Sequence, residues 1–385
     1  MTRAAVNPDL LTWARVRAGM EPLDLERRFK KLDAWESGEA QPTLKQLEAF
    51  AHAVHVPVGY LFLPRPPEEP LPIPDFRTID GRAARRPSPN LLDMVYACQE
   101  RQSWYREFSL ANRSRGVEFV GSRRLSDRPE GVAAEMSRVL EFDLEARAAC
   151  RTWEEALRLF VSLAEQAGVL VMVSGVVLSN NTRTLDPEEF RGFALADNRA
   201  PLVFINGADS KAGQMFTLAH ELAHLWLGSS AISNASAAPL SGYRREEVWC
   251  NAVAAELLVP LSALRPALEP GEPLSAALQR LARRFKVSTL VILRRLLDAG
   301  WLTRPAFETA WLDERDRLKE LAARSGSGGG DFYRTTLSRV SRRFARALVE
   351  STLEGQTLYR DAFRMLGVAK TETFNNIGRE LGVMP

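Results

Sequence analysis

Residues 215–227, MFTLAHELAHLWL, constrain the fold more than any other segment of the chain. Their apolar side chains recur at helical spacing without glycine or proline, which predicts one uninterrupted helix. Residues four apart lie on one face of a helix, so His220 and His224 project side by side. Both imidazoles can then reach one tetrahedral zinc ion, and Glu221 is placed to act as general base toward a water molecule on that metal.

The five-residue pattern H-E-x-x-H also occurs by chance, so the other histidines matter. The chain has four histidines. His52 and His55 lie near the N-terminus, where we interpret them as helix-surface residues rather than ligands, and the other two stand in the motif. Histidine is therefore concentrated at the predicted metal site.

A third ligand is expected from a second predicted helix, residues 245–259. Glu247 and Asn251 lie four apart there, so the carboxylate can complete the zinc site while the amide holds a ligand histidine from behind. Glu246 is the alternative ligand and shares its face with Cys250. A third interpretation is a solvated Glu-Glu pair at a helix start, which the helix dipole favours.

Composition limits the class of protein. A chain of 385 residues suggests two to four folding units, because domains hold about 100 to 200 residues. There is no run of about 18 apolar residues and no signal segment, so we expect a cytoplasmic protein without a membrane partner. Three widely spaced cysteines offer no disulfide framework. A net charge of +3 excludes nucleic-acid binding by bulk electrostatics, so any DNA contact must be local.

The segments FTLAHELAHLWLG, EVWCNAVAAELLVP and LARRFKVSTLVILRRL resemble the ImmA/IrrE family of metallo-endopeptidases over residues 169–301. The segments WESGEAQPTLKQLEAFA and VPVGYLFLP are similar to the Xre-type regulators to which this peptidase is often joined. The resemblance implies a zincin-like, thermolysin-like minimal fold, zinc held by His220, His224 and Glu247, and cleavage of a protein partner such as a transcriptional repressor. This ligand set agrees with the one expected from the spacing.

We therefore expect an α+β protein that is mostly helical. Its predicted parts are an Xre-like helical module (1–63), a Pro-rich strap or linker (64–89), a helical region (90–167), a zinc peptidase core with a small sheet (168–265), a helix-turn-helix-like segment (266–305) and a helical C-terminal docking region (306–385). Chains of this layout also resemble antitoxin-like regulators encoded beside a toxin, which makes a toxin a candidate partner.

Peptide hydrolysis also needs a donor for the oxyanion. Tyr243 is the candidate, with the neighbouring Arg244 or Arg245 as alternatives, although a loop tyrosine more often has no chemical role. The β-rich residues 201–206 or 190–195 are candidates for aligning substrate by strand addition, and ordinary core strands are the alternative.

DNA binding has two candidate sites. Residues 23–35 leave little room for a complete helix-turn-helix, and Trp35 is expected to be a core anchor. A basic cluster here can touch phosphates or form a solvated face. In the second segment, residues 281–297, the arginines could form a positive face for DNA, or the segment could pack against the peptidase core. The sequence favours neither interpretation. The two sets are Arg27, Arg28, Lys30 and Lys31, and Arg283, Arg284, Arg294 and Arg295.

Two functions follow. The first is a zinc metallo-endopeptidase regulator that cuts a repressor or antitoxin-like partner, with Glu221 as general base. The second is a non-catalytic, DNA-binding transcriptional regulator or antitoxin that uses the zinc fold as a scaffold.

Overall fold

The computed structural model describes residues 3–69, 71–75, 78–79, 82–83, 87–233, 244–324 and 332–384. Helices make up 59% of the chain and the strands form a small mixed sheet, which confirms the predicted α+β class. The chain divides into two compact units, whose boundaries lie within the predicted segments 64–89 and 90–167. One comprises Met1–Pro72 with Arg85–Val95, and the other Ile73–Ala84 with Tyr96–Pro385.

The N-terminal unit is a bundle of short helices around its own apolar core. Thr43 begins one of these helices with a capping box, in which its hydroxyl accepts from the Gln46 amide. Trp35 is 3% exposed in this core, as expected from the sequence, and its ring lies 6.0 Å from that of Phe29. The helices are α1 (Pro8–Arg17), α2 (Pro22–Glu26), α3 (Leu32–Glu36), α4 (Leu44–Ala53) and the 3-10 helix η1 (Val58–Phe62).

Helices α2 and α3 have five residues each, which agrees with the little room that the sequence leaves for a helix-turn-helix. The predicted basic cluster lies in the turn between them, and its four side chains are exposed. Arg15 fastens the end of α3 to α1, because its guanidinium pairs with both oxygens of Glu36 at 2.8 and 3.0 Å. The cluster comprises Arg27, Arg28, Lys30 and Lys31.

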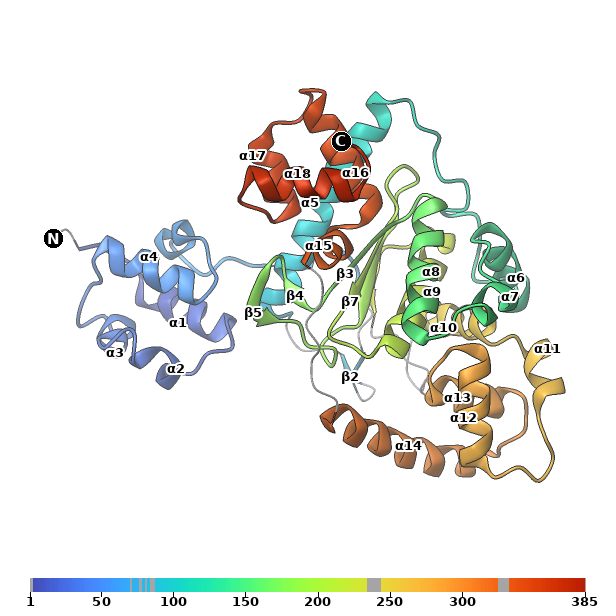
Figure 1. Cartoon of the computed structure of the whole chain (residues 1–385). Coiled ribbons are helices and arrows are strands. Elements are labelled where there is room, and N and C mark those ends of the chain that lie inside the picture. Colours follow the sequence, from blue (N-terminus) through green and yellow to red (C-terminus); the bar gives the residue numbers. More distant parts are fainter. Residues whose placement is uncertain are drawn as a thin grey trace. The chain divides into compact units, whose positions relative to one another are not determined.

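The larger unit is built on a mixed four-stranded sheet, drawn in green to yellow in Figure 1. Its strand order is β3-β7-β6-β8, with β3 parallel to β7 and the other neighbours antiparallel. The register pairs Phe193 with Phe204 on one side and with Ile232 on the other. The strands are β3 (Leu170–Ser174), β6 (Gly192–Leu195), β7 (Leu202–Asn206) and β8 (Ala231–Ser233).

Both faces of this sheet are covered, so its strands are continuous apolar runs rather than alternating ones. Val171 and Val203 point into the core that includes the helices α8 (Trp153–Gln166) and α9 (Lys211–Leu227). Met172 points to the opposite face, where its sulfur lies 3.9 Å from Cys98 Sγ of α5 (Pro89–Ala111). Figure 1 shows α9 and α5 on opposite sides of the sheet.

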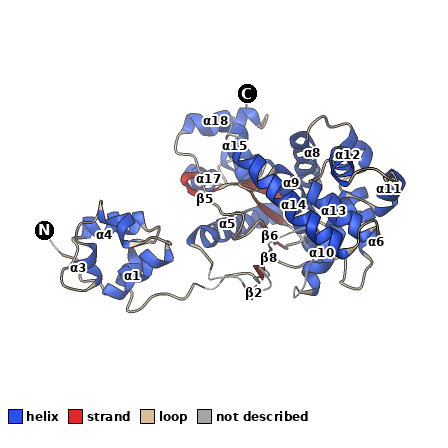
Figure 2. Ribbon diagram, turned by 90° about the horizontal axis from the view of Figure 1, so that it is seen from below, coloured by secondary structure: helices blue, strands red, loops and turns tan. Residues whose placement is uncertain are grey.

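Further elements surround this centre, and Figure 2 shows how far helices outnumber strands. They are α6 (Pro129–Val139), α7 (Leu144–Ala148), α10 (Arg245–Leu258), α11 (Leu261–Leu264), η2 (Arg265–Ala267), α12 (Leu274–Phe285), α13 (Thr289–Asp298) and α14 (Arg304–Arg324), with two short ladders formed by β1 (Thr78–Ile79) and β2 (Arg82–Ala83) and by β4 (Val176–Val177) and β5 (Asn180–Thr184).

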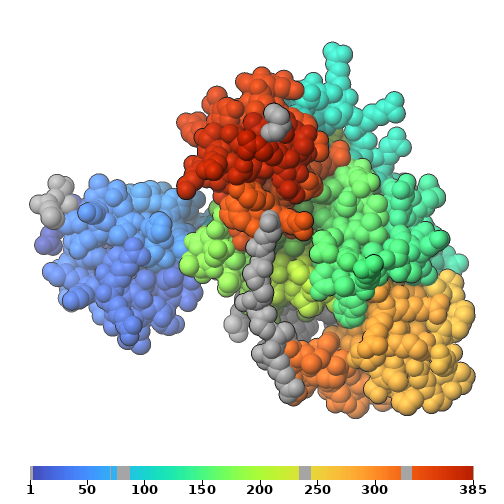
Figure 3. Space-filling view, in the orientation of Figure 1, coloured from blue at the N-terminus to red at the C-terminus, as the bar shows by residue number. Residues whose placement is uncertain are grey.

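The C-terminal helices belong to the same unit, and in Figure 3 their red and orange atoms lie directly against the green atoms of that unit. Glu165, at the end of α8, accepts hydrogen bonds from Ser341 Oγ at 2.5 Å and from the Arg343 amide at 3.4 Å. Arg343 also donates to the Tyr105 hydroxyl of α5 at 2.8 Å. The helices are α15 (Phe332–Val340), α16 (Arg342–Leu353), α17 (Tyr359–Leu366) and α18 (Thr371–Glu380).

No single helix among the described residues is long and apolar enough to cross a membrane. The consecutive segments Arg245–Leu258 and Leu261–Ala267 reach the necessary length and apolar composition only when they are counted together. They are bent by 40° relative to each other.

Candidate metal centre

The predicted motif helix, α9, is the most deeply buried helix of the site. The Ser210 hydroxyl begins it by accepting from the Gly213 amide at 3.0 Å, and Gly228 ends it with φ 71°. Every residue from Gln214 to Trp226 is buried. A helix enclosed on all sides holds its ligand side chains in fixed positions, because rotamer changes would meet packed neighbours.

Strand β6 approaches α9 closely, and a glycine makes this possible. A Cβ atom at Gly192 would lie 2.6 Å from Thr217 Cγ2 and 3.1 Å from Glu221 Oε1. The first distance is too short for a real contact, so any larger residue here would push the strand away from the helix. Gly192 therefore sets how near the sheet lies to the carboxylate of the motif.

Three ligand-type side chains meet between α9 and α10. The Nε2 atoms of His220 and His224 lie 3.1 Å apart, and Glu247 places its carboxylate oxygens 3.4 Å from the first and 3.1 Å from the second. Their exposures are 0%, 0% and 1%, so water does not compete for these atoms in this conformation. The structure thus brings together both motif histidines and Glu247.

Glu246, the alternative ligand, is half-buried in the first turn of α10 and is not part of this cluster. The packing of α10 against α9 decides between the two glutamates, because adjacent residues on a helix point about 100° apart. The carboxylate that faces the histidines belongs to Glu247.

Asn251 lies one turn after Glu247 on α10 and contacts the far side of a ligand histidine. Its Oδ1 atom lies 3.0 Å from His220 Nδ1, so it accepts a hydrogen bond when that nitrogen carries the proton. The tautomer held in this way leaves the His220 Nε2 lone pair directed at the cluster. This is the geometry expected of Asn251 from its spacing.

Opposite charges stabilise one another in this centre. Burial alone would raise the pKa of Glu247, yet the two facing imidazoles lower it to about 2. Burial acts against the charged form of His220 too, but the Glu247 carboxylate raises the pKa of this histidine. Burial lowers the pKa of His224. The buried Glu247 carboxylate thus needs a positive charge beside it, which a bound cation would supply.

Glu221 faces the cluster from α9, and β8 holds one of its two oxygens. Ser233 Oγ donates a short hydrogen bond to Oε1, while Oε2 is buried and has no hydrogen-bond partner among the described residues. Burial raises the pKa of Glu221 to about 8, although His220 and Ser233 both act to lower it. A cation bound at the cluster would favour the ionised form, which could then accept a proton at the oxygen without a partner.

The donor set fits zinc. Zn–N bonds of about 2.0 to 2.1 Å at a tetrahedral angle put two histidine nitrogens about 3.3 Å apart, close to the separation of the two Nε2 atoms. The ligand atoms of His220, His224 and Glu247 all lie within 4.8 Å of one another. Two histidines, one carboxylate and a position left for water form the set typical of catalytic zinc.

Replacing Asn251 with alanine is expected to lower zinc affinity by about 10- to 100-fold, because the imidazole of His220 would lose the acceptor that orients it. Competition with a zinc chelator of known affinity measures the change. Asn251→Asp is the matched control, since it keeps an acceptor at the same place and should retain most of the affinity. Equal affinities for the alanine variant and the wild type would show that Asn251 does not orient the ligand.

The remaining predictions for the site concern the donor for the oxyanion and the strands that could align a substrate. Tyr243 lies outside the described residues. Arg244 and Arg245 are exposed at the start of α10. Residues 201–206 contain β7 and residues 190–195 contain β6, and both strands have neighbours on each side. They are interior strands, so neither has an edge free for strand addition.

The second set of arginines divides between surface and core. Arg283 and Arg284 are exposed at the end of α12. Arg295 is 4% exposed, and its guanidinium pairs with Glu256 of α10 and, at 3.0 Å, with Asp298.

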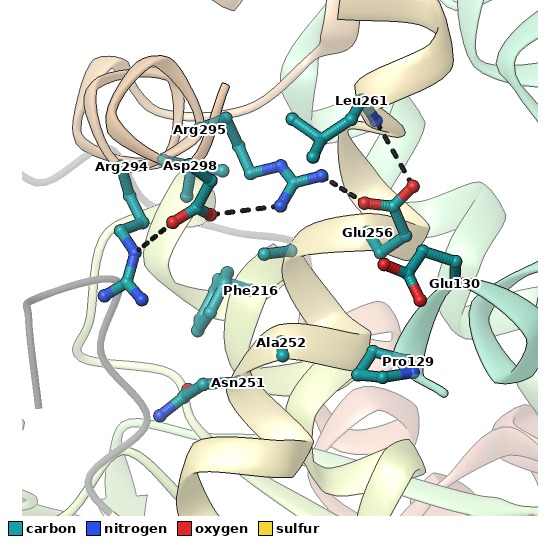
Figure 4. A pocket seen from close by; sticks show the side chains of 12 residues that line it. Pro129, Glu130, Phe216, Asn251, Ala252, Glu256, Leu261, Arg294, Arg295 and Asp298 are labelled. Carbon is teal, nitrogen blue, oxygen red and sulfur yellow. Dashed lines mark hydrogen bonds and ion pairs between the residues drawn. The ribbon is translucent and has the colours of Figure 1, made fainter. Parts of the chain in front are cut away.

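Figure 4 shows Arg295 between these carboxylates, beside a pocket of about 190 Å³. Arg294, half-buried, pairs with Asp298 at 2.9 Å. Of the two uses left open for this segment, packing against the core is the one that the geometry favours for Arg295.

Ser233 is a residue of the site that was not predicted from sequence patterns. The strand that carries it, β8, has three residues and follows α9 after Gly228, so no periodic pattern reveals it. Its position beside Glu221 depends on pairing with β6, a contact across about 40 residues. The only local hint is a β-branched residue, Ile232, soon after a glycine that ends a helix.

A buried cluster of two histidines and a glutamate, with a second glutamate beside it, is the arrangement of a metallopeptidase centre. Comparison with protein families agrees with this class. Residues 164–297 match the IrrE N-terminal-like domain of Peptidase M78, a metallopeptidase family, and support the resemblance to the ImmA/IrrE family. Residues 340–380 match a domain of unknown function. No curated protein matches the chain.

Proposed function

We propose that the protein is a zinc-dependent metallo-endopeptidase regulator with a zincin-like core that cleaves a protein partner. The observation that carries this proposal is the convergence of His220, His224 and Glu247 on one buried point, with Glu221, the residue after His220, holding a buried oxygen that has no hydrogen-bond partner among the described residues. An ordinary core would not gather two imidazoles and two carboxylates at 0 to 1% exposure without a charge for them to bind.

When bound, zinc supplies an acidified water molecule and polarises the carbonyl of the peptide bond. Glu221 accepts the proton of the attacking water at Oε2 and later returns it to the leaving amine. Ser233 keeps Oε1 in place, so Oε2 keeps its direction during both transfers. The tautomer of His220 held by Asn251 keeps a lone pair on Nε2 throughout the cycle.

The partner that the resemblance implies is a transcriptional repressor or an antitoxin-like protein, and a partner toxin is the further candidate. A peptidase that acts as a regulator must recognise its protein partner selectively. Tyr243 stays the candidate donor for the oxyanion.

The test is a capture experiment with Glu221→Gln, a variant expected to hold about one zinc ion per chain but not to turn over its partner. Proteins retained by this variant in cells are identified and then incubated with zinc-loaded wild type or variant. We expect the wild type alone to cut the captured partner at a defined bond. A stable partner that neither protein cuts, despite bound zinc, would contradict the proposal.

A DNA-binding regulator is the second candidate function. The observation that favours it is the exposed basic cluster between α2 and α3, which is free to touch phosphates. Helix α13 is less suited to enter a groove, because six of its ten residues are buried. Binding of promoter DNA that weakens with salt and with replacement of the cluster would support this function, which is compatible with the first.

A further inference from the structure

Strand β8 lies at the edge of the described sheet, yet all three of its residues are 0% exposed. On one side it pairs with β6, with Ile232 opposite Phe193. On the other side the Ile232 amide donates to the Pro74 carbonyl at 3.0 Å, and Asp75 forms a parallel bridge with Ile232. Residues 73–75 of the chain therefore occupy the outer edge of this strand. From here on, the strap means these three residues of the predicted Pro-rich segment.

The edge that the strap covers runs beside the proposed catalytic carboxylate. Ser233, the next residue after Ile232, donates its hydroxyl to Glu221. A strand edge presents unpaired amides and carbonyls to any extended chain, and peptides bind proteins by adding to such edges. An extended peptide paired with Ile232 would thus pass close to Glu221.

The residues of the strap differ in burial. Ile73 is buried at 8% exposure, whereas Pro72 and Pro74 are exposed. Proline has no amide hydrogen to donate, so two of the four residues 72–75 can only accept from a neighbouring strand. A longer peptide able to donate as well as accept would pair more extensively with β8 than the strap does.

The proposed reaction also requires a change in this region. A scissile carbonyl must come within contact distance of the metal site, but His220, His224 and Glu221 are all 0% exposed. Side chains that are fully buried must become accessible before they can contact a substrate, so substrate entry requires a rearrangement near these residues.

We propose that the strap is an intramolecular strand that blocks the outer edge of β8, and that an extended segment of the protein partner must displace it before cleavage. This inference rests on the proposed peptidase function and adds a mode of regulation to it. The partner is then a protein with an accessible extended segment, and the strap keeps the enzyme latent until that segment arrives.

The first test is Ile73→Ser in the zinc-loaded full chain, which removes the buried anchor of the strap. Hydrogen exchange at the Ile232 amide is expected to accelerate by about tenfold or more, since this amide would lose its acceptor for a larger fraction of the time. The rate of cleavage of β-casein, an unfolded protein, should rise with it. Leu63→Ser is the matched control, an apolar-to-serine change at a residue that is 36% exposed and outside the strap.

A second variant locks the strap instead of releasing it. Asp75→Cys and Ile232→Cys place two thiols at bridge partners, in a Cys150→Ser background because Cys98 and Cys250 are fully buried. Oxidation should reduce casein cleavage to the rate of Glu221→Gln, and a reductant should restore it. The reduced form of the same protein shows whether the variant is folded.

Equal cleavage by the oxidised and reduced forms would overturn the inference. So would faster exchange at Ile232 without faster Glu221-dependent cleavage, because the released edge would then not admit an extended chain. Either result leaves the proposed function standing if the captured partner is still cut by the wild type and not by Glu221→Gln.

Discussion

Replacing Glu221 with glutamine is expected to slow cleavage of the protein partner by about 10²- to 10⁴-fold, the contribution typical of a general base. Glutamine keeps the size of the side chain and can still contact Ser233, but its amide cannot accept the proton of the attacking water. Zinc content should not change, because His220, His224 and Glu247 are untouched. Initial rates and metal analysis on the same preparations measure both quantities.

The matched control for this prediction is Glu246→Gln. It is the same chemical change in a half-buried residue of the same region, outside the metal cluster. Its rate should stay within about twofold of the wild type, since Glu246 contributes no ligand atom to the metal cluster. If both variants lost activity equally, the loss would not report on a base at position 221.

The second large effect is expected on stability, from Arg147→Met. Arg147 is 1% exposed and joins three helices of the larger unit. Its guanidinium donates to the backbone carbonyls of Leu258 at 2.6 Å, Leu257 at 3.3 Å and Phe285 at 3.2 Å. These carbonyls lie at the C-terminal ends of α10 and α12. Burial lowers the pKa of this group only to about 10, so it stays charged at neutral pH.

Methionine would fill much of the space but leave these buried carbonyls without donors. Each unsatisfied group costs about 1 to 3 kcal/mol, so for three carbonyls we expect a loss of at least about 3 kcal/mol in the free energy of unfolding. Urea denaturation followed by the fluorescence of the tryptophans measures it.

Arg138→Met, at an exposed position at the end of α6, is the control and should change stability by less than about 0.5 kcal/mol. A loss for Arg147→Met no larger than this would mean that solvent or other groups satisfy the helix ends. Because α10 carries Glu247, a destabilised variant that still folds should also bind zinc more weakly.

Much of the secondary structure could be predicted because helices are local. The motif helix, the glutamate helix and the pair of helices around residues 286–288 all occur where apolar spacing and caps indicate them. The pairing of His220 with His224 is equally local, since residues four apart share a helix face whatever surrounds them. The α+β class followed from the short β-rich runs before the motif.

Contacts between distant segments could not be predicted in this way. Spacing favours Glu247, which shares a helix face with Asn251, but it leaves Glu246 as an alternative, and the rotation of α10 against α9 decides between them. The strands at residues 190–195 and 201–206 are candidates for strand addition in sequence, yet the pairing order makes them interior and gives the edge to β8. A single strand does not carry this information, because its neighbours come from other parts of the chain.

By itself, the sequence determined the helix, the two histidines at one face of it and the glutamate between them, since 3.6-residue periodicity needs no partner. Tertiary structure alone decided that Ser233 contacts Glu221 and that Arg295 lies in the core, and it settled the choice of Glu247 over the alternative Glu246. The physical reason is that ligand sets and buried ion pairs depend on the distance and rotation between packed elements, and these are set by side-chain packing across the whole unit.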